Sequence, residues 1–178
     1  RKIEIIREKL LFGLMRAERI AHKHPTLPVL NCVLCDVRDG VLTLTATNLD
    51  AGVKISLPVK MSSAGTVAVP AALFTTIVTH AAPGSVLTIT ADEKQCSVRA
   101  TTRVSQLRIH PHEEFPSLPV IDGEARFSMG VKQFVSGLKS VWYSAAVSPI
   151  KPELSSVFFT TQADSFVFAA TDAFRLAE

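Results

Sequence analysis

Histidine and cysteine are the residues of this chain best suited to binding a metal ion, and the sequence holds five of the first and three of the second. His110 and His112 flank a proline in a segment rich in Pro and polar residues. Two ligands there are too few for a metal site, so a solvated linker is favoured. His22 and His24 flank Lys23 at the end of an expected helix, where a basic cap suits the helix dipole. No metal site is therefore predicted.

Two of the cysteines, Cys32 and Cys35, have the CxxC spacing of redox and zinc pairs. They stand in "LNCVLCDV", which is typical of a strand, and an odd spacing on a strand sends side chains to opposite faces. Buried free cysteine is therefore favoured over a redox or zinc pair. This interpretation suits a reducing cytosol, so we expect the protein to be cytoplasmic.

No arrangement of residues typical of an enzyme stands out. The sequence contains no Gly-rich phosphate loop, no HExxH and no GxSxG. We therefore predict no catalytic residues and no cofactor.

The composition suits an ordinary globular protein of one to two domains, with 178 residues, 47% hydrophobic and 20% charged. Lys and Arg number 19 against 16 acidic residues, and this excess permits a nucleic-acid partner without arguing for one. No run of about 18 apolar residues occurs, so we expect no membrane span. Charges within "RKIEIIREKLLFGLM" argue against a secretion signal.

The basic residues of two expected helices share a spacing of seven, which places them on one face of each helix. Lys9, Arg16 and Lys23 lie on the first, opposite its apolar stripe, and Lys132 and Lys139 have the same relation on the third. Taken alone, these spacings favour a solvated polar face.

The elements that must position these residues occur more than once along the chain. A single shift of 124 residues, without a gap, aligns the beginning of the chain with its end, which indicates a duplication. The aligned pairs are Gly13 with Gly137, Leu14 with Leu138, Ala21 with Ala145, Pro25 with Pro149, Pro28 with Pro152, Leu30 with Leu154, Val33 with Val157, and Ala46-Thr47 with Ala170-Thr171.

A shorter repeat lies inside the first copy. A shift of 54 residues aligns "GVLTLTATNLDAGVKI" with "KQCSVRATTRVSQLRI", and both alternate apolar and polar residues as a half-buried strand does. A third occurrence is "DSFVFAATDAFRLAE" near the end of the chain, where Ala-Thr is followed by Asp as it is by Asn in the first. A short strand (3–6, 66–69, 126–129) followed by a helix precedes each of the three. The expected fold is therefore α+β, built of repeated β-α-β-β-β half-domains. One complete domain covers 1–118, a linker covers 119–124, and the first half of a second domain covers 125–178.

This organisation resembles the bacterial DNA sliding clamp, the β subunit of DNA polymerase III. The resemblance covers essentially the whole chain, and four phrases carry it. They are "HPTLPVLNCVLCDVRDGVLTLTATNLD", "VPAALFTTIV", "EEFPSLP" and "ATDAFRLAE". The resemblance implies the DNA-clamp fold, and a non-catalytic processivity factor in a complex that has DNA-directed DNA polymerase activity.

In that family each subunit has three domains, and two subunits close a ring around duplex DNA. The implied partners are double-stranded DNA bound without sequence preference, the polymerase III catalytic subunit, the clamp loader, other clamp-binding peptides and a second subunit. This chain would cover the first domain and half of the second, as a fragment or a degenerate clamp. The alternative is a protein-interaction module that does not encircle DNA.

The resemblance also implies a DNA-contacting set, in which basic helix faces meet phosphates without reading bases. His24 stands where the family has an arginine, as does Ala72, and Lys151 keeps a charge in the loop 148–153. The implied positions are Lys9, Arg16, Lys23, His24, Lys132, Lys139 and Lys151.

A second implied site is the second-domain part of a hydrophobic pocket for partner peptides. Ala173 replaces the usual Gly and Phe174 the usual His, which would make the pocket more apolar. The alternative is that Leu154 and Leu176 belong to the core. The implied positions are Leu154, Thr171, Ala173, Phe174, Arg175 and Leu176.

Overall fold

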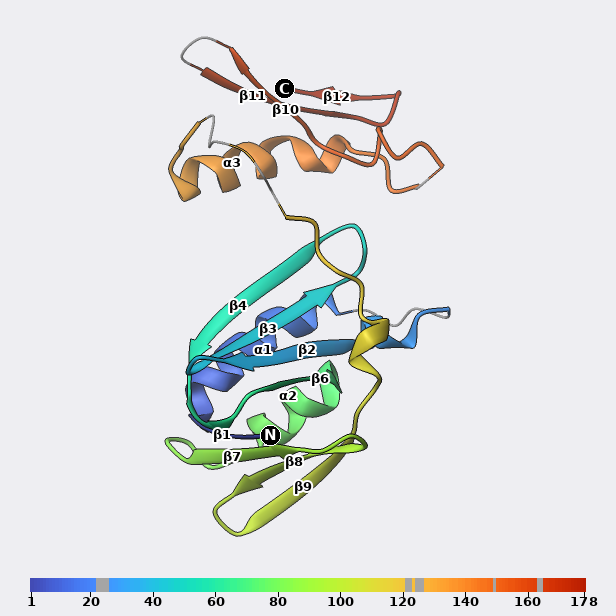
Figure 1. Cartoon of the computed structure of the whole chain (residues 1–178). Coiled ribbons are helices and arrows are strands. Elements are labelled where there is room, and N and C mark those ends of the chain that lie inside the picture. The colour runs from blue at the N-terminus through green and yellow to red at the C-terminus, as the bar shows by residue number, and fades with distance from the viewer. Residues whose placement is uncertain (22–25, 121–122, 124–126, 149, 163–164) are drawn as a thin grey trace. The chain divides into compact units, whose positions relative to one another are not determined.

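The computed structural model describes residues 1–21, 26–120, 123, 127–148, 150–162 and 165–178. The chain forms two compact units, Arg1–Val120 and Ile121–Glu178, and each is described by itself (Figure 1). No helix in these described ranges is long and apolar enough to cross a membrane.

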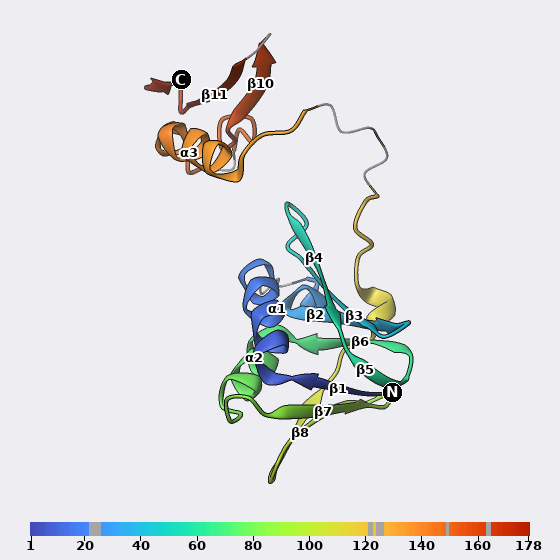
Figure 2. The ribbon, with the colours of Figure 1, turned by 90° about the vertical axis from the view of Figure 1, so that its left-hand side faces the viewer.

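The described residues of the first unit form two α-helices, two short 3-10 helices (Pro28–Asn31 and His112–Glu114) and two antiparallel sheets (Figures 1 and 2). The strand order is β4-β3-β2-β6 in one sheet and β5-β1-β7-β8-β9 in the other. In chain order the elements are β1 (Lys2–Ile6), α1 (Arg7–Ile20), β2 (Cys32–Arg38), β3 (Val41–Thr47), β4 (Gly52–Pro58), β5 (Lys60–Ser63), β6 (Gly65–Pro70), α2 (Ala71–Thr79), β7 (Val86–Ala91), β8 (Gln95–Ala100) and β9 (Arg103–Arg108).

The two halves of this unit exchange their first strands. Strands β2, β3 and β4 of the first half are joined by β6, which pairs with β2 along residues 32–37. Strands β7, β8 and β9 of the second half are joined by β1, which pairs with β7. Each sheet of this unit therefore contains a strand from the other half.

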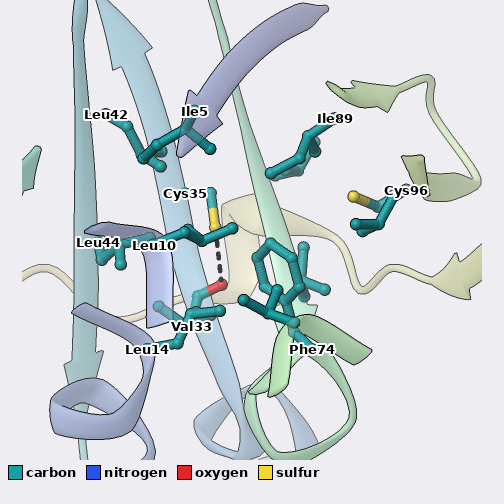
Figure 3. Packing of buried hydrophobic residues seen from close by; sticks show 14 of the residues in the cluster. Ile5, Leu10, Leu14, Val33, Cys35, Leu42, Leu44, Phe74, Ile89 and Cys96 are labelled. Atoms are coloured by element: carbon teal, nitrogen blue, oxygen red, sulfur yellow. Dashed lines mark hydrogen bonds between the residues drawn. The ribbon is translucent and has the colours of Figure 1, made fainter. Parts of the chain in front are cut away.

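The core of the first unit lies where α1 and α2 meet the sheets. The sequence predicts an apolar stripe of Leu10, Leu14, Ala17 and Ala21 along the first helix. The structure confirms it for the first three, which are fully buried, whereas Ala21 lies just beyond the end of α1 and is partly buried. Figure 3 shows Leu10 and Leu14 beside Leu44 of β3, with Phe74 of α2 opposite. The two helices lie side by side (Figure 2).

The interpretation of the cysteines is also confirmed. All three are free and buried. Cys35 and Cys96 belong to the main core, whereas Cys32 faces a separate cluster with Phe115. Cys32 and Cys35 thus point to opposite faces of β2, as their odd spacing requires.

The start of α1 is tied to the end of α2 by side-chain hydrogen bonds. The guanidinium of Arg7 donates to the carbonyl oxygens of Val78 (3.2 Å) and Thr79 (2.8 Å) in the last turn of α2. Glu8 Oε1 accepts a hydrogen bond from the backbone N–H of Gly84 (2.9 Å). These bonds hold the two half-domains together at one end of the helix pair.

The second unit contains α3 (Val131–Val141) and a sheet of order β10-β11-β12, formed by Phe158–Gln162, Ser165–Thr171 and Leu176–Ala177. Phenylalanine rings fill the space between helix and sheet, with centroid separations from 4.9 to 6.1 Å. The rings are those of Phe127, Phe134, Phe159, Phe166 and Phe168.

The helix packs on the strand in the same way in both units. A Cβ on Gly13 would lie 2.7 Å from Leu44 Cδ1, and a Cβ on Gly137 would clash with the ring of Phe168. Gly13 with Gly137 and Leu44 with Phe168 are both separated by 124 residues. The close approach of helix to strand therefore explains why both copies have glycine there.

Two expectations for the second unit are wrong. Residues 127–129 form no strand, and residue 126 of that expected strand lies outside the described residues. The equivalent strand β1 pairs with β7 of the other half and with β5, and the described residues within 127–178 supply no such partner. The repeat also predicts that Leu138 is a core residue like its counterpart Leu14, but Leu138 is only partly buried, whereas Leu14 is fully buried.

Candidate functional site

A tight turn follows β11 and carries most of the predicted peptide-binding residues. Thr171 Oγ1 donates to the carbonyl of Arg175 (2.7 Å) and accepts from the N–H of Ala173 (3.1 Å). Asp172 Oδ1 accepts from the N–H groups of Phe174 and Arg175, both at 3.0 Å. The turn thus satisfies its own backbone, as Asx turns do.

The charge of Asp172 is stabilised inside this turn. The N–H of Phe174 first, and that of Arg175 next, lower the pKa of the Asp172 carboxyl below its usual value. Arg175 Nε also lies 3.0 Å from Asp172 Oδ2. Ala173 has φ +75, a left-handed conformation that costs about 1–2 kcal/mol for a residue with a Cβ.

The same turn follows β3 in the first unit. Thr47 Oγ1 donates to the carbonyl of Ala51 (2.8 Å), and Asn48 Oδ1 accepts from the N–H of Ala51 (2.7 Å). Leu49 has φ +77, like its counterpart Ala173. The repeated Ala-Thr-Asn/Asp phrase is therefore a repeated turn, built by a Thr hydroxyl and an Asx side chain.

The turn of the second unit presents apolar side chains to solvent. Phe174 is 97% exposed and Leu176 is 70% exposed, while Leu154 is partly buried. The alternative that Leu176 is simply core is therefore wrong, and Leu154 lies between core and surface. A folded turn that exposes a phenyl ring beside a leucine has the character of a docking surface.

The predicted basic positions that the structure describes are all exposed. Lys9 and Arg16 lie on α1, Lys132 and Lys139 on α3, and Lys151 in the loop before β10. Lys23 and His24 lie outside the described residues. Ala72 on α2, where the family has an arginine, is exposed.

An aromatic contact organises the exposed face of α1. The guanidinium carbon of Arg16 lies 3.4 Å from the centroid of the Phe12 ring. Arg16 Nη1 also donates to the carbonyl oxygen of Phe12 (2.9 Å). The sequence argument included Arg16 and missed Phe12, although the i,i+4 spacing places both residues on one face.

The remaining candidates for chemistry find no support in the part of the chain that the structure describes. No group of three or more His, Cys, Asp or Glu side chains there could hold a metal ion. His112 Nδ1 lies 3.4 Å from Glu113 Oε2, and His22 lies outside this part. Burial raises the pKa of the Cys32 and Cys96 thiols to about 12, which disfavours the thiolate that zinc binding and redox chemistry need.

Comparison with known proteins agrees with a fold of repeated half-domains. Residues 1–119 match the family model described as the DNA polymerase III beta subunit, N-terminal domain. The chain belongs to the DNA polymerase III beta-subunit family.

Two relatives in this family show how much of the protein the match covers. A beta sliding clamp of Synechocystis sp. is 32% identical over 173 residues, which are 93% of this chain and 44% of the relative. The beta sliding clamp of Escherichia coli K12 is 28% identical over 178 residues, 99% of this chain and 48% of the relative. The chain thus spans about half the length of the curated beta-subunit relatives it matches.

Solved beta-subunit structures have the same fold. DNA polymerase III subunit beta from Pseudomonas aeruginosa superposes with a TM-score of 0.92 at 24% identity, covering 99% of this chain and 48% of that one. A sliding clamp from Bartonella birtlesii, bound to griselimycin, gives a TM-score of 0.88 at 28% identity, with 98% and 48% covered. The predicted DNA-clamp fold is confirmed.

Proposed function

We propose that this protein acts as a DNA sliding clamp, the non-catalytic processivity factor of the replicative DNA polymerase in the cytoplasm. The observation that carries the proposal is membership of the beta-subunit family, combined with a fold built wholly of clamp half-domains. The alternative, an interaction module that never encircles DNA, is not favoured, because the curated relatives are sliding clamps.

We assign duplex binding to the exposed basic residues of the helices. Lys9 and Arg16 of α1, with Lys132 and Lys139 of α3, can approach phosphates without reading bases. Lys23, His24 and Lys151 complete the proposed set. Such contacts are non-specific and weakened by salt, and they let a protein slide along DNA. A ring tolerates weak contacts because its topology keeps it on the duplex.

Ring closure would use the open edge of the first unit. Within the described residues, β9 pairs with β8 on one side and has no strand on the other. Val104 on β9 is 51% exposed, and Leu73 on the neighbouring helix α2 is 58% exposed. An unpaired strand edge beside apolar side chains suits the addition of a strand from a second subunit.

Partner proteins would dock at the turn after β11. Phe174, Leu176 and the partly buried Leu154 supply apolar surface, and Arg175 supplies charge. Thr171 and Ala173 shape the turn. We propose that peptide segments of the polymerase catalytic subunit, the clamp loader and other clamp-binding proteins bind here.

DNA binding tests the proposal directly. Fluorescence anisotropy would follow a labelled duplex as KCl is raised, with the original chain and a Lys9→Glu, Arg16→Glu, Lys139→Glu triple variant. We expect weak, sequence-independent binding, and a slope of log affinity against log salt that falls by about 2–3 in the variant.

A matched control changes the net charge equally on exposed lysines outside the proposed set, Lys54, Lys60 and Lys94. This control should keep most of the salt slope. Equal losses in both triple variants would mean that net charge alone attracts the duplex. Tight binding of one particular duplex sequence would also contradict the proposal.

The ring itself is tested with the polypeptide encoded by the whole reading frame. A clamp loaded on nicked circular DNA should stay bound at high salt and be released when the circle is cut. Release at the same rate from intact and cut circles would support the non-encircling alternative.

A further inference from the structure

The exposed face of α1 is apolar as well as basic. Phe12 is 51% exposed and Met15 is 48% exposed, so both of these apolar side chains lie on the outer side of the helix. Exposed Lys9, Arg16 and Arg19 surround them at helical spacing. Sliding on duplex phosphates needs only the cations, so the phenyl ring at the centre of this face calls for a different explanation.

The ring and one of the cations are held together. The Arg16 guanidinium carbon lies 3.4 Å from the Phe12 ring centroid, and Arg16 Nη1 bonds to the Phe12 carbonyl at 2.9 Å. These two contacts restrain the Arg16 side chain, so a ligand that uses it finds the guanidinium already placed. The guanidinium lies over one face of the ring, so the two planar groups form a positively charged stack, which an aliphatic side chain could not provide.

Helix α1 carries two acidic side chains, Glu8 and the partly buried Glu18, and Glu8, which precedes Lys9, is already engaged. Glu8 Oε1 accepts from the N–H of Gly84 and lies 3.4 Å from Arg7 Nη1. The Gly84 bond is the main cause of the lowered pKa of Glu8, so the carboxylate stays charged but has cationic and N–H partners of its own. The face around Phe12 therefore remains attractive to a polyanion.

We propose that Phe12 and Arg16 form a stacking platform for an unpaired base of single-stranded DNA, with Lys9 and Arg19 on flanking phosphates. Duplex bases are stacked on one another and offer no free ring face, whereas single-strand binding combines aromatic or Arg stacking with a basic track. Lys9 and Arg19 lie about 15 Å apart along the helix, the span of a few nucleotides. This inference rests on the proposed DNA-binding role and specifies which form of DNA α1 recognises.

The probes that test it are labelled oligo(dT) of about 15 nucleotides, an abasic oligomer with the same number of phosphates, and a duplex of the same length. The variants are Phe12→Leu, which removes the π-system from an exposed site, and Arg16→Lys, which keeps the charge. Phe158→Leu is the matched control, because Phe158 is also exposed (63%) and belongs to no proposed site.

We expect Phe12→Leu to weaken oligo(dT) binding by about fivefold to a hundredfold, with the salt slope unchanged, because base stacking is lost and phosphate contacts are kept. Arg16→Lys should weaken it less. Binding of the abasic oligomer and of the duplex should stay within about twofold in the Phe12 variant, as should all binding by the Phe158 control.

A second readout does not depend on affinity. The only tryptophan, Trp142, can be replaced by Phe, and Phe12→Trp then places a single fluorophore on the platform. Its emission should be quenched by oligo(dT) and not by the abasic oligomer.

The outcomes separate this inference from the proposed function. Unchanged oligo(dT) affinity in Phe12→Leu overturns the stacking platform, and it leaves the proposed function standing if duplex binding still depends on Lys9, Arg16 and Lys139. Equal weakening of oligo(dT) and duplex in that variant also overturns it. Binding of neither DNA at low salt overturns both proposals.

Discussion

Leu14 and Leu138 occupy the same position of the repeat, yet we expect truncation to cost them very different amounts. Leu14 is 0% exposed. Its neighbour Gly13 holds α1 so close to β3 that a Cβ there would lie 2.7 Å from Leu44, so the site has little room to collapse. Leu14→Ala should therefore cost about 3–5 kcal/mol, the upper part of the range for buried leucines.

Leu138→Ala should cost about 1–2 kcal/mol. The side chain is only partly buried, so less apolar area returns to water and part of the space that it leaves opens to solvent. The two costs differ because the two helices have different neighbours. Helix α2 packs beside α1, whereas Val131 and Val135 of α3 are exposed.

Hydrogen exchange followed by mass spectrometry suits this comparison, because it follows each compact unit by its own peptides. Protection of β3 should fall in Leu14→Ala, and protection of β11 should fall by less in Leu138→Ala. Lys9→Ala and Lys139→Ala, at exposed positions of the same two helices, should change stability by less than about 0.5 kcal/mol. Equal losses at Leu14 and Leu138 would refute the reasoning from burial.

Two further predictions follow from the lowered and raised pKa values. Because the pKa of Asp172 is lowered in the folded turn, its contribution to stability is full above the usual carboxyl pKa and is lost as the pH falls through the folded value. The Phe174 amide should therefore lose protection in acid, and Asp172→Asn should remove that step. Burial raises the pKa values of the Cys32, Cys35 and Cys96 thiols. Ellman's reagent at pH 8 should therefore label none of them in the folded protein and all three in urea. Labelling of the folded protein would contradict their burial.

The sequence by itself determined the local structure and the repeat. Alternation of apolar and polar residues predicted β3 and β8, and the spacing of Leu10, Leu14 and Ala17 predicted the buried face of α1. The phrases at Thr47 and Thr171 folded into the same turn, because its hydrogen bonds join residues no more than four apart. Interactions of such short range are encoded wherever the same residues recur.

Only the tertiary structure decided which elements complete one another. Strand exchange between the halves of the first unit depends on hydrogen bonds between β1 and β7, which are distant in sequence. The strand expected at 126–129 was wrong for the same reason, since residues 127–129 have no partner strand among the described residues of the second unit. Backbone pairing needs a second strand, so a pattern in one segment cannot establish it.

Burial was decided at the same level. Leu14 and Leu138 occupy the same position of the helical pattern, but Leu14 is fully buried and Leu138 only partly, because burial depends on the elements that pack around each helix. The exposed ring of Phe12 under Arg16 was hidden in the sequence, because a pattern of polar and apolar residues does not say which side chains outside the core touch. Side-chain contact depends on rotamers and neighbouring elements, and these are set only when the domain has folded.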